Sequence, residues 1–310
     1  MFSLPLMHAR HPFIIKRARR TSILLCAAAT VLLPAARTAS QPEQTPDIFI
    51  SIQPANAEQG SVIRISVSCP ASVNVLSYRW GKLSAPLFTD SPGRWFGLAP
   101  VDMDHDTGTQ RLLVTLRNAQ GELCNREVVF EVIAKKFPEQ HITVDENKVS
   151  LSAQDLERHN RERAQVTAAF AASQPRRLWS DAFILPVQGR ISTPFGVRRF
   201  INMQPRNPHS GIDIAAPAGT PVMAASAGIV CLTGDHFFAG KSVYIDHGNA
   251  IFSMYFHLDS IDVPAGRSVA RGDIIGRVGA TGRSTGPHLH WGVRMLDTAA
   301  DPLSLLALFD

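Results

Sequence analysis

The sequence predicts a mainly β protein with three parts: an amino-terminal immunoglobulin-like β-sandwich, a linker with one helix, and a carboxyl-terminal domain built on an antiparallel β-sheet. Short runs that alternate apolar and polar residues recur from residue 47 to about residue 134, and again from residue 183 to the end. Gly, Pro, Asn and Asp separate these runs, as expected for short strands joined by tight turns. Between the two β regions, a stretch after Ser152 is rich in strong helix formers.

Length and composition are those of an ordinary globular protein with two domains. The chain has 310 residues, of which 45% are hydrophobic and 18% are charged. This composition is unlike that of disordered, collagen-like or coiled-coil chains. We place a leader at residues 1–40, the sandwich at 41–134, the linker at 135–182 and the second β domain at 183–310.

The positive net charge belongs to the first 40 residues. The chain holds 31 Lys and Arg against 26 Asp and Glu, for a formal charge of +5, but residues 1–40 contain six of the basic residues and none of the acidic ones. The remainder therefore carries a charge of −1. Binding to DNA or RNA needs a basic surface, so the sequence predicts no nucleic-acid partner.

Residues 1–40 have the pattern of a signal peptide. Five positive charges within the first 20 residues precede a mostly apolar segment at 22–36, and Thr38 and Ser40 fit a small-x-small cleavage rule. The protein is therefore expected in the periplasm or secreted. The alternative is an uncleaved membrane anchor, although the apolar segment is shorter than the about 20 residues that span a bilayer. No later segment is apolar enough to span, so no stable membrane span is expected after cleavage.

The first β region, up to residue 134, contains about 90 residues of alternating runs such as SVIRISVSC and REVVFEVIA, separated by turn sequences such as NAEQG and NAQGE. This spacing predicts an all-β sandwich. Cys69, Trp80 and Cys124 follow one another in the order found in immunoglobulin domains, but Cys124 comes directly after a turn. In an oxidising compartment Cys69 and Cys124 either form a disulfide or remain free thiols, and the sequence leaves both states open.

The linker is predicted to be a polar connector at 135–149 followed by a helix. Ser152-x-x-Asp155 resembles the start of a helix, and Pro175 marks its end. Leu156, Val166 and Phe170 are apolar residues among many charges. We therefore expect the helix to lie on one of the two domains.

Three histidine patterns stand out in the second β domain: His209-Ser-Gly-Ile-Asp213, His257 in the run MYFHL, and His288-Leu-His290. Taken singly, each pattern is more typical of a turn cap or an edge strand than of a functional site. Alternate residues of a strand share one face, so His209 and Asp213 can point the same way, as can His288 and His290. Their occurrence together in one β domain favours a metal site.

Two imidazoles and one carboxylate are a suitable ligand set for Zn²⁺, and three protein ligands leave a fourth position for water, as in catalytic zinc sites. His257 and one of the 288/290 pair would then be available to accept a proton from that water and to stabilise the developing oxyanion. Tyr255 and Trp291 have the opposite strand phase and are expected to pack within the sheet.

The second β domain resembles the lysostaphin-like, or LytM-type, zinc metalloendopeptidases, which hydrolyse peptide cross-links of bacterial peptidoglycan. The resemblance covers residues 183–303. It rests on an ordered set of motifs: TPFGVR (193–198), HSGIDIAAPAGTPV (209–222), ASAGIV (225–230), YIDHG (244–248), YFHL (255–258), GDIIGRVGATGRSTGPHLHWGV (272–293) and DP (301–302).

The resemblance implies a role for each polar residue of the site. His209, Asp213 and His290 are expected to bind zinc, His288 to activate the water, and His257 to stabilise the tetrahedral intermediate. None of these five positions departs from the family pattern, which implies an active enzyme. Its partners would be the stem peptides and cross-bridges of peptidoglycan, and the amino-terminal domain is a candidate contact for another envelope protein.

Three alternatives have different chemistry. The same ligand types bind iron in oxygenases, although the HxxxD spacing and the two additional histidines favour zinc. A non-catalytic peptidoglycan-binding or hydrolase-activating module would retain the groove without turnover. A zinc endopeptidase that cleaves Gly-rich proteins would use the same site on another substrate. The loops at 199–208 and 233–241 are expected to set the bond that is cleaved.

Overall fold

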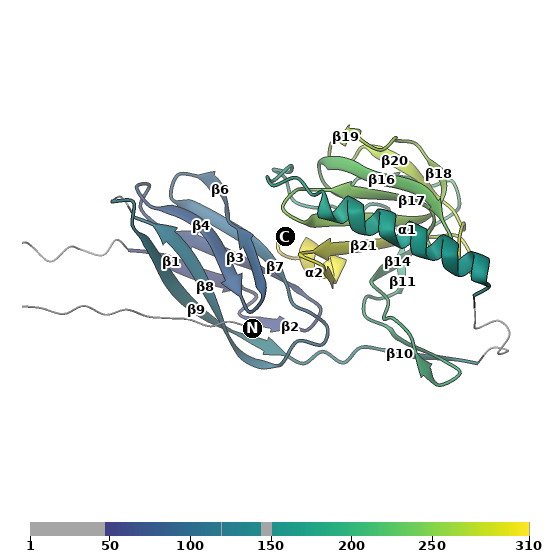
Figure 1. Ribbon diagram of the computed structural model, residues 1–310, viewed down its shortest axis with the longest axis horizontal. Coiled ribbons are helices and arrows are strands. Elements are labelled where there is room, and N and C mark those ends of the chain that lie inside the picture. Colours follow the sequence, from purple (N-terminus) through teal and green to yellow (C-terminus); the bar gives the residue numbers. More distant parts are fainter. Residues whose placement is uncertain (1–46, 119, 144–150, 310) are drawn as a thin grey trace, which may run out of the picture. The chain divides into compact units, whose positions relative to one another are not determined.

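The computed structural model describes residues 47–118, 120–143 and 151–309, and strands dominate these residues (Figure 1). The mainly β fold class is confirmed. The predicted signal peptide at 1–40 lies outside the described residues. Among the described residues, no helix has the length and apolar character needed to cross a membrane.

The amino-terminal part contains two sheets. The four-stranded sheet has the order β1, β3, β7, β6, and its strands are β1 (Phe49–Gln53), β3 (Val62–Ser68), β7 (Arg94–Pro100) and β6 (Phe88–Ser91). The five-stranded sheet has the order β2, β9, β8, β4, β5, and its strands are β2 (Asn56–Glu58), β9 (Leu123–Ile133), β8 (Gly108–Arg117), β4 (Asn74–Trp80) and β5 (Leu83–Pro86).

These two sheets share one buried core. Ile63 and Ile65 of β3 belong to the same cluster as Leu112 and Val114 of β8, and all four are fully buried. The alternating apolar runs therefore pair the two sheets face to face, as the period-2 pattern predicts. The immunoglobulin-like assignment itself stays a prediction. Cys69 and Cys124 are free thiols, so the disulfide alternative is not formed here.

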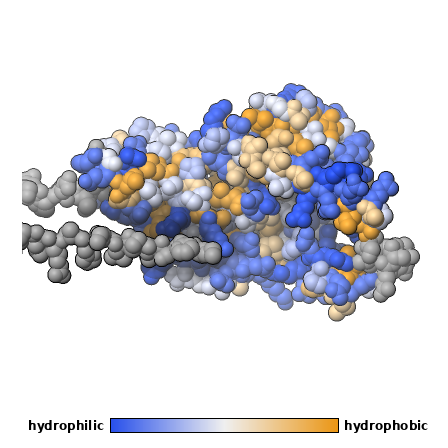
Figure 2. Space-filling view, in the orientation of Figure 1, coloured by the Kyte–Doolittle hydropathy of each residue, from blue (hydrophilic) through white to orange (hydrophobic). Residues whose placement is uncertain are grey.

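The linker contains the predicted helix and one strand that the sequence did not indicate. Helix α1 (Ala153–Ala171) begins where Ser152 accepts a hydrogen bond from the amide of Asp155, and it contacts β16 through Arg158 and the Asp235 carbonyl at 2.7 Å. The helix therefore lies on the second β domain, as expected. Its amino-terminal end is hydrophilic on the visible face (Figure 2). The segment predicted as a polar connector at 135–149 contains β10 (Glu139–Ile142), which pairs in parallel with β12 (Arg198–Ile201).

The carboxyl-terminal part contains a ten-stranded sheet in which every pairing is antiparallel, as predicted. Its main path has the order β11, β14, β21, β18, β17, β16, β19. These strands are β11 (Arg190–Thr193), β14 (Gly211–Ala215), β21 (His288–Met295), β18 (Ile251–Ile261), β17 (Gly240–Asp246), β16 (Gly228–His236) and β19 (Ser268–Val269). Three further strands complete the sheet: β15 (Pro221–Met223), β20 (Ile274–Val278) and β22 (Thr298–Ala300). The remaining elements of this part are β13 (Gln204–Pro205), which pairs with β12, and α2 (Pro302–Leu306).

One face of this sheet forms the second core. Tyr255 and Trp291 have no exposed surface and pack there with Ile212, Ile214 and Leu289, which confirms their predicted role in the sheet. Side chains alternate between the two faces along a strand. The residues next to Trp291 and Leu289 in β21 therefore point to the other face, and His288 and His290 occupy two of those positions. His257 lies two residues after Tyr255, where β18 shifts its register against β17.

Candidate metal centre

Two neighbouring strands and one loop bring three metal-binding side chains together. His209 precedes β14, Asp213 lies within β14, and His290 lies in β21 directly opposite Asp213 in the antiparallel register. His209 Nε2, Asp213 Oδ1 and His290 Nδ1 are each 2.9 Å from the other two. All three side chains are buried. A metal ion in proteins is commonly bound by His, Cys, Asp or Glu. Among the described residues, His209, Asp213 and His290 are the group of such side chains whose ligand atoms lie close enough together to bind one ion.

The ligand set depends on close packing between β14 and β21. A Cβ atom on Gly211 would lie 2.4 Å from the carbonyl oxygen of Trp291, so only glycine fits at this position. His209 Nδ1 is 2.9 Å from the carbonyl oxygen of Pro194. Because a carbonyl oxygen only accepts hydrogen bonds, Nδ1 carries the proton and Nε2 of the neutral ring presents a lone pair to Asp213.

The donor chemistry of these three residues fits a divalent metal ion. A lone pair on His209 Nε2 and a carboxylate oxygen of Asp213 are both acceptors, and two acceptors at 2.9 Å need a cation or a proton between them. Two imidazole nitrogens and one carboxylate oxygen are the ligand types that zinc uses in catalytic sites. Nitrogen and oxygen ligands without sulfur also suit other first-row metals.

Burial and charge both act on the protonation of this cluster. Burial alone would raise the pKa of Asp213, but the imidazoles of His209 and His290 beside its carboxylate outweigh burial and hold its pKa well below the usual range. Burial lowers the pKa of His290 to about 4, although its hydrogen bond with Asp213 opposes this shift. Asp213 is therefore ionised and His290 neutral near pH 7, which are the forms that bind metals.

His288 lies at the start of β21, two residues before His290, and points to the same side of the sheet. Its Nδ1 is 2.8 Å from the carbonyl oxygen of Gly286, so Nδ1 carries the proton. Its Nε2 is 3.8 Å from Asp213 Oδ1. Nε2, the nitrogen of His288 that the Gly286 carbonyl does not engage, therefore lies beside the ligand cluster.

His257 reaches the same place from β18. Its ring centroid is 4.8 Å from that of His288 and 6.2 Å from that of His290. Its Nδ1 is 2.9 Å from the carbonyl oxygen of Thr281, and burial lowers its pKa despite this hydrogen bond. His257 also has a φ of 62°, a left-handed conformation that is uncommon outside glycine.

The structure thus brings together all five residues that the sequence singled out. Sequence reasoning missed the groups that hold them: the carbonyl oxygens of Pro194 and Thr281, and the ring of Phe256, which stacks on His290 at 5.2 Å. No side-chain type signals a functional carbonyl. Phe256 was detectable only as the residue opposite His290 in a pairing of distant strands.

Two further histidines of this domain form hydrogen bonds away from the metal cluster. His247 is fully buried, with Nδ1 2.8 Å from the Ala227 carbonyl oxygen and Nε2 2.7 Å from Ser253 Oγ. His236 ends β16, and its Nδ1 is 2.7 Å from Ser242 Oγ. Neither of these sets of partners includes a residue of the metal cluster.

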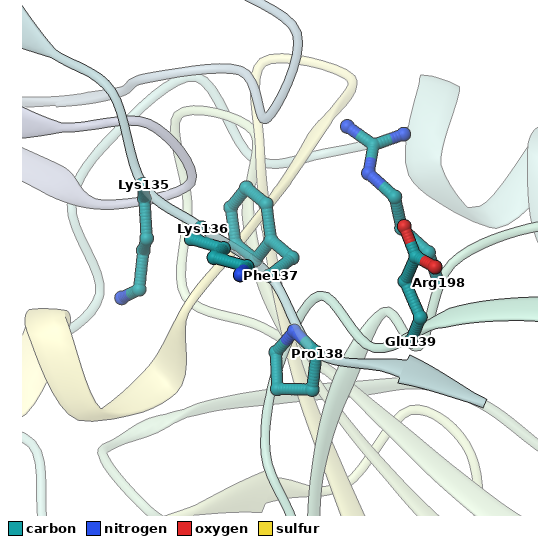
Figure 3. A pocket seen from close by; sticks show the side chains of 6 residues that line it. All are labelled: Lys135, Lys136, Phe137, Pro138, Glu139 and Arg198. Atoms are coloured by element: carbon teal, nitrogen blue, oxygen red, sulfur yellow. The ribbon is translucent and has the colours of Figure 1, made fainter.

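None of the five site residues lines a cavity of about 690 Å³ (Figure 3). It is lined by the start of the linker and by Arg198. Two of its cations are paired, because Lys135 contacts Glu58 and Asp301, and Arg198 contacts Asp104. The side chains of Lys135 and Arg198 also point away from each other (Figure 3). We therefore assign this cavity no part in the chemistry.

Comparison with known proteins places the same residues in one family. The profile described as Peptidase family M23 matches residues 207–302, a range that contains all five polar residues of the site. A crystal structure from Pseudomonas aeruginosa, described as a candidate peptidase M23, is 35% identical with a TM-score of 0.58. That match covers 77% of this chain and 95% of the other.

Two curated relatives match over part of their length. The DD-carboxypeptidase/endopeptidase Mpg of Neisseria meningitidis is 42% identical over 119 residues, which are 38% of this chain and 27% of the relative. The peptidoglycan DD-endopeptidase ShyA of Vibrio cholerae is 48% identical over 103 residues, which are 33% of this chain and 24% of the relative. The matched region thus spans about a quarter of each of these relatives.

Proposed function

The chain belongs to peptidase family M23, and from this premise we propose that it is a zinc-dependent endopeptidase that hydrolyses peptide cross-links of bacterial peptidoglycan. The substrate class comes from similarity to relatives named as peptidoglycan DD-endopeptidases. The observation that carries the proposal is the convergence of His209, Asp213 and His290 at 2.9 Å, with His288 Nε2 3.8 Å from the same carboxylate oxygen.

The metal would be held by His209 Nε2, Asp213 Oδ1 and His290 Nδ1. Zinc bound by three protein ligands supplies a Lewis acid that polarises the scissile carbonyl and lowers the pKa of a water molecule towards about 7. The Pro194 carbonyl fixes the tautomer of His209, so that Nε2 points inward without rearrangement. This preorganisation lowers the cost of binding the ion.

His288 is proposed as the general base. Its Nδ1 donates to the Gly286 carbonyl oxygen, so its Nε2 accepts the proton of the attacking water and passes it to the leaving amine. His288 Nε2 lies close enough to the carboxylate of Asp213 that a positive charge on the ring is stabilised after proton transfer.

His257 is proposed to stabilise the tetrahedral intermediate. Its Nδ1 donates to the Thr281 carbonyl oxygen, so Nε2 is the atom available to the substrate. Only the protonated ring donates from Nε2, and the negative charge that develops on the carbonyl oxygen favours that form. The ring reaches the site from a different strand than His288, so the two histidines approach the substrate from different directions.

Action outside the cytoplasm follows from the proposed substrate and from the predicted signal peptide, and export is part of this proposal. The amino-terminal sandwich is proposed as the part that contacts peptidoglycan or another envelope protein. The bond that is cleaved is expected to depend on the loops at 199–208 and 233–241. Both segments, expected to be loops, are largely hairpins: 199–208 contains most of β12 and all of β13, and 233–241 contains the end of β16 and the start of β17. The first leads into His209, and Ala239 of the second accepts a hydrogen bond from the His257 amide.

The decisive experiment is mass spectrometry of the fragments that the purified protein releases from isolated peptidoglycan. The incubation is done with zinc, after chelation, and with a H288A variant. Loss of cross-linked peptides only in the zinc-loaded parent supports the proposal and identifies the bond. Absence of release by a zinc-loaded, folded parent contradicts it and favours a binding module. Digestion of a soluble Gly-rich protein in a parallel sample tests the protein-substrate alternative.

A further inference from the structure

His257 is held in an unusual backbone conformation by groups outside its own strand. Its φ is 62°. The pairing of β18 with β17 shifts register across His257, and the pairing of β18 with β20 shifts register just after Leu258. A non-glycine residue at positive φ is strained and persists only when its surroundings support it. The His257 amide donates to the Ala239 carbonyl oxygen at 2.8 Å, and its ring donates to the Thr281 carbonyl oxygen at 2.9 Å.

The two segments that supply these carbonyls lie directly against each other. A Cβ on Gly240 would be 2.4 Å from the carbonyl carbon of Thr281, and a Cβ on Gly282 would be 2.3 Å from the amide nitrogen of Gly240. Both glycines also have positive φ angles. The amide of Arg283 donates to the Phe238 carbonyl oxygen at 3.0 Å, which joins the segments again one residue further on.

One hydroxyl group connects this pair of segments to the strand that carries His257. Thr281 Oγ1 accepts a hydrogen bond from the Lys241 amide at 2.9 Å and donates to the Leu258 carbonyl oxygen at 2.7 Å. Leu258 is the residue after His257. Thr281 therefore contacts His257 through its own carbonyl. Its side chain holds Leu258, the residue after His257, and Lys241, which lies two residues after the Ala239 whose carbonyl accepts from the His257 amide.

We propose that Thr281 is a positioning residue for His257, an inference that rests on the proposed function for its catalytic consequence. The hydroxyl holds the Thr281 carbonyl in the place where it accepts from Nδ1, and this contact directs Nε2 of His257 towards the substrate. Removal of the hydroxyl leaves the Lys241 amide and the Leu258 carbonyl without this partner, so the turn that carries the Thr281 carbonyl is released. A displacement of about 1 Å in a catalytic group costs up to about 100-fold in rate.

The test compares Thr281→Val, which keeps the shape of the side chain and removes the hydroxyl, with Thr281→Ser, which keeps the hydroxyl. Thr220→Val is the matched control, because the Thr220 hydroxyl also holds a turn of this domain by donating to the Pro217 carbonyl oxygen at 2.7 Å. All four full-length, zinc-loaded proteins are assayed on peptidoglycan, with activity expressed per folded, metal-loaded molecule. We expect a kcat about 10- to 100-fold lower in T281V with KM within about 3-fold, and parent-like values in T281S and T220V.

A spectroscopic measurement gives a second readout that does not depend on turnover. The ¹⁵N shifts of the His257 ring report which nitrogen carries the proton, and we expect the Nδ1–H tautomer in the parent, T281S and T220V. T281V is expected to show a mixture of the two neutral tautomers. If the parent fails to cleave peptidoglycan, the proposed function fails while the tautomer comparison still decides the role of Thr281.

Two results would overturn the inference. In the first, T281V keeps both the kcat and the His257 tautomer of the parent. In the second, T281V loses activity only in proportion to its loss of folded, metal-loaded molecules, which would assign the hydroxyl to stability alone. Thr281→Ala repeats the comparison with a smaller side chain if T281V does not fold.

Discussion

The phenyl ring of Phe256 lies parallel to the imidazole of His290, with 5.2 Å between ring centroids and an angle of 7° between the planes. The two residues are direct partners in the antiparallel pairing of β18 with β21. The ring centroid of Phe256 is also 5.3 Å from that of Tyr244 in β17. Phe256 thus limits the rotation of a proposed metal ligand from the adjacent strand.

Replacement of Phe256 by Ala is expected to weaken zinc binding without removing a ligand. The His290 ring would gain rotational freedom, and loss of a group that orients a ligand typically costs about 10- to 100-fold in metal affinity. Competition with a chromogenic chelator measures this change. Phe256→Leu should lose less zinc affinity than Phe256→Ala. Phe49→Ala serves as the control, because Phe49 lies in the sandwich and is 69% exposed. Equal affinities in F256A and F49A would show that the stack does not orient His290.

Replacement of His288 by Gln is expected to abolish turnover while the protein keeps its zinc. His288 Nε2 is 3.8 Å from Asp213 Oδ1, farther than either nitrogen of the ligand cluster, so its loss removes the proposed base and no ligand. The kcat should fall by about 10²-fold or more, as is usual for a general base. Metal content per protein, measured by atomic absorption, should match the parent. Loss of the metal in H288Q but not in H290A would mean that base and ligand were assigned to the wrong residues.

Periodicity in the sequence predicts which polar residues of the site share a face of one strand. His288 and His290 share a face because they are two residues apart on a strand, and the structure places His290 opposite Asp213 as a consequence of the β14–β21 pairing. Helix α1 was predictable because Ser152 and Asp155 form a local start signal. The shared face of His288 and His290 and the start of α1 depend on residues that are close in the sequence, whereas the meeting of His290 with Asp213 depends on the pairing of two distant strands.

Features that depend on distant backbone groups were not predictable in this way. Strand β10 forms because its partner β12 lies about 60 residues later, and its own composition is that of a polar connector. The left-handed conformation of His257 depends on the carbonyl oxygens of Ala239 and Thr281, and main-chain acceptors have no sequence signature. The sequence therefore indicates the candidate side chains of the site, whereas only the fold shows what orients them.

Removal of the metal is expected to destabilise the folded protein, because the ligand cluster exists only in the folded state. Zinc at about 100 times its dissociation constant would stabilise the fold by about 2.7 kcal/mol. Calorimetry should therefore show a melting temperature that falls by several degrees on chelation and recovers when zinc is added. Asp213→Ala should melt at the same temperature with and without zinc. A parent whose melting temperature ignores zinc would contradict the proposed site.

His247 is expected to make the stability of the domain depend on pH. The ring is fully buried, with Nδ1 2.8 Å from the Ala227 carbonyl oxygen and Nε2 2.7 Å from Ser253 Oγ. Burial lowers the pKa of His247 to about 4 from a reference of 6.5, although the Ala227 hydrogen bond and Asp246 oppose this shift. The folded state thus favours the neutral ring.

The sign follows from proton binding in the two states. Between pH 6.5 and about 4 the unfolded chain protonates His247 while the folded chain does not, so stability is complete above pH 6.5 and falls as the pH falls through this window. A pKa shift of this size corresponds to a loss of about 3 kcal/mol in the free energy of unfolding at the lower end of the window. Other buried groups also titrate there, so the measurement is a difference: urea unfolding of the chelated parent and of His247→Asn, each at pH 7 and pH 4.5. The loss of unfolding free energy on acidification should be smaller in H247N by about 2 kcal/mol or more, since its side chain does not titrate. Equal losses in the two proteins would show that His247 protonates without cost in the folded state.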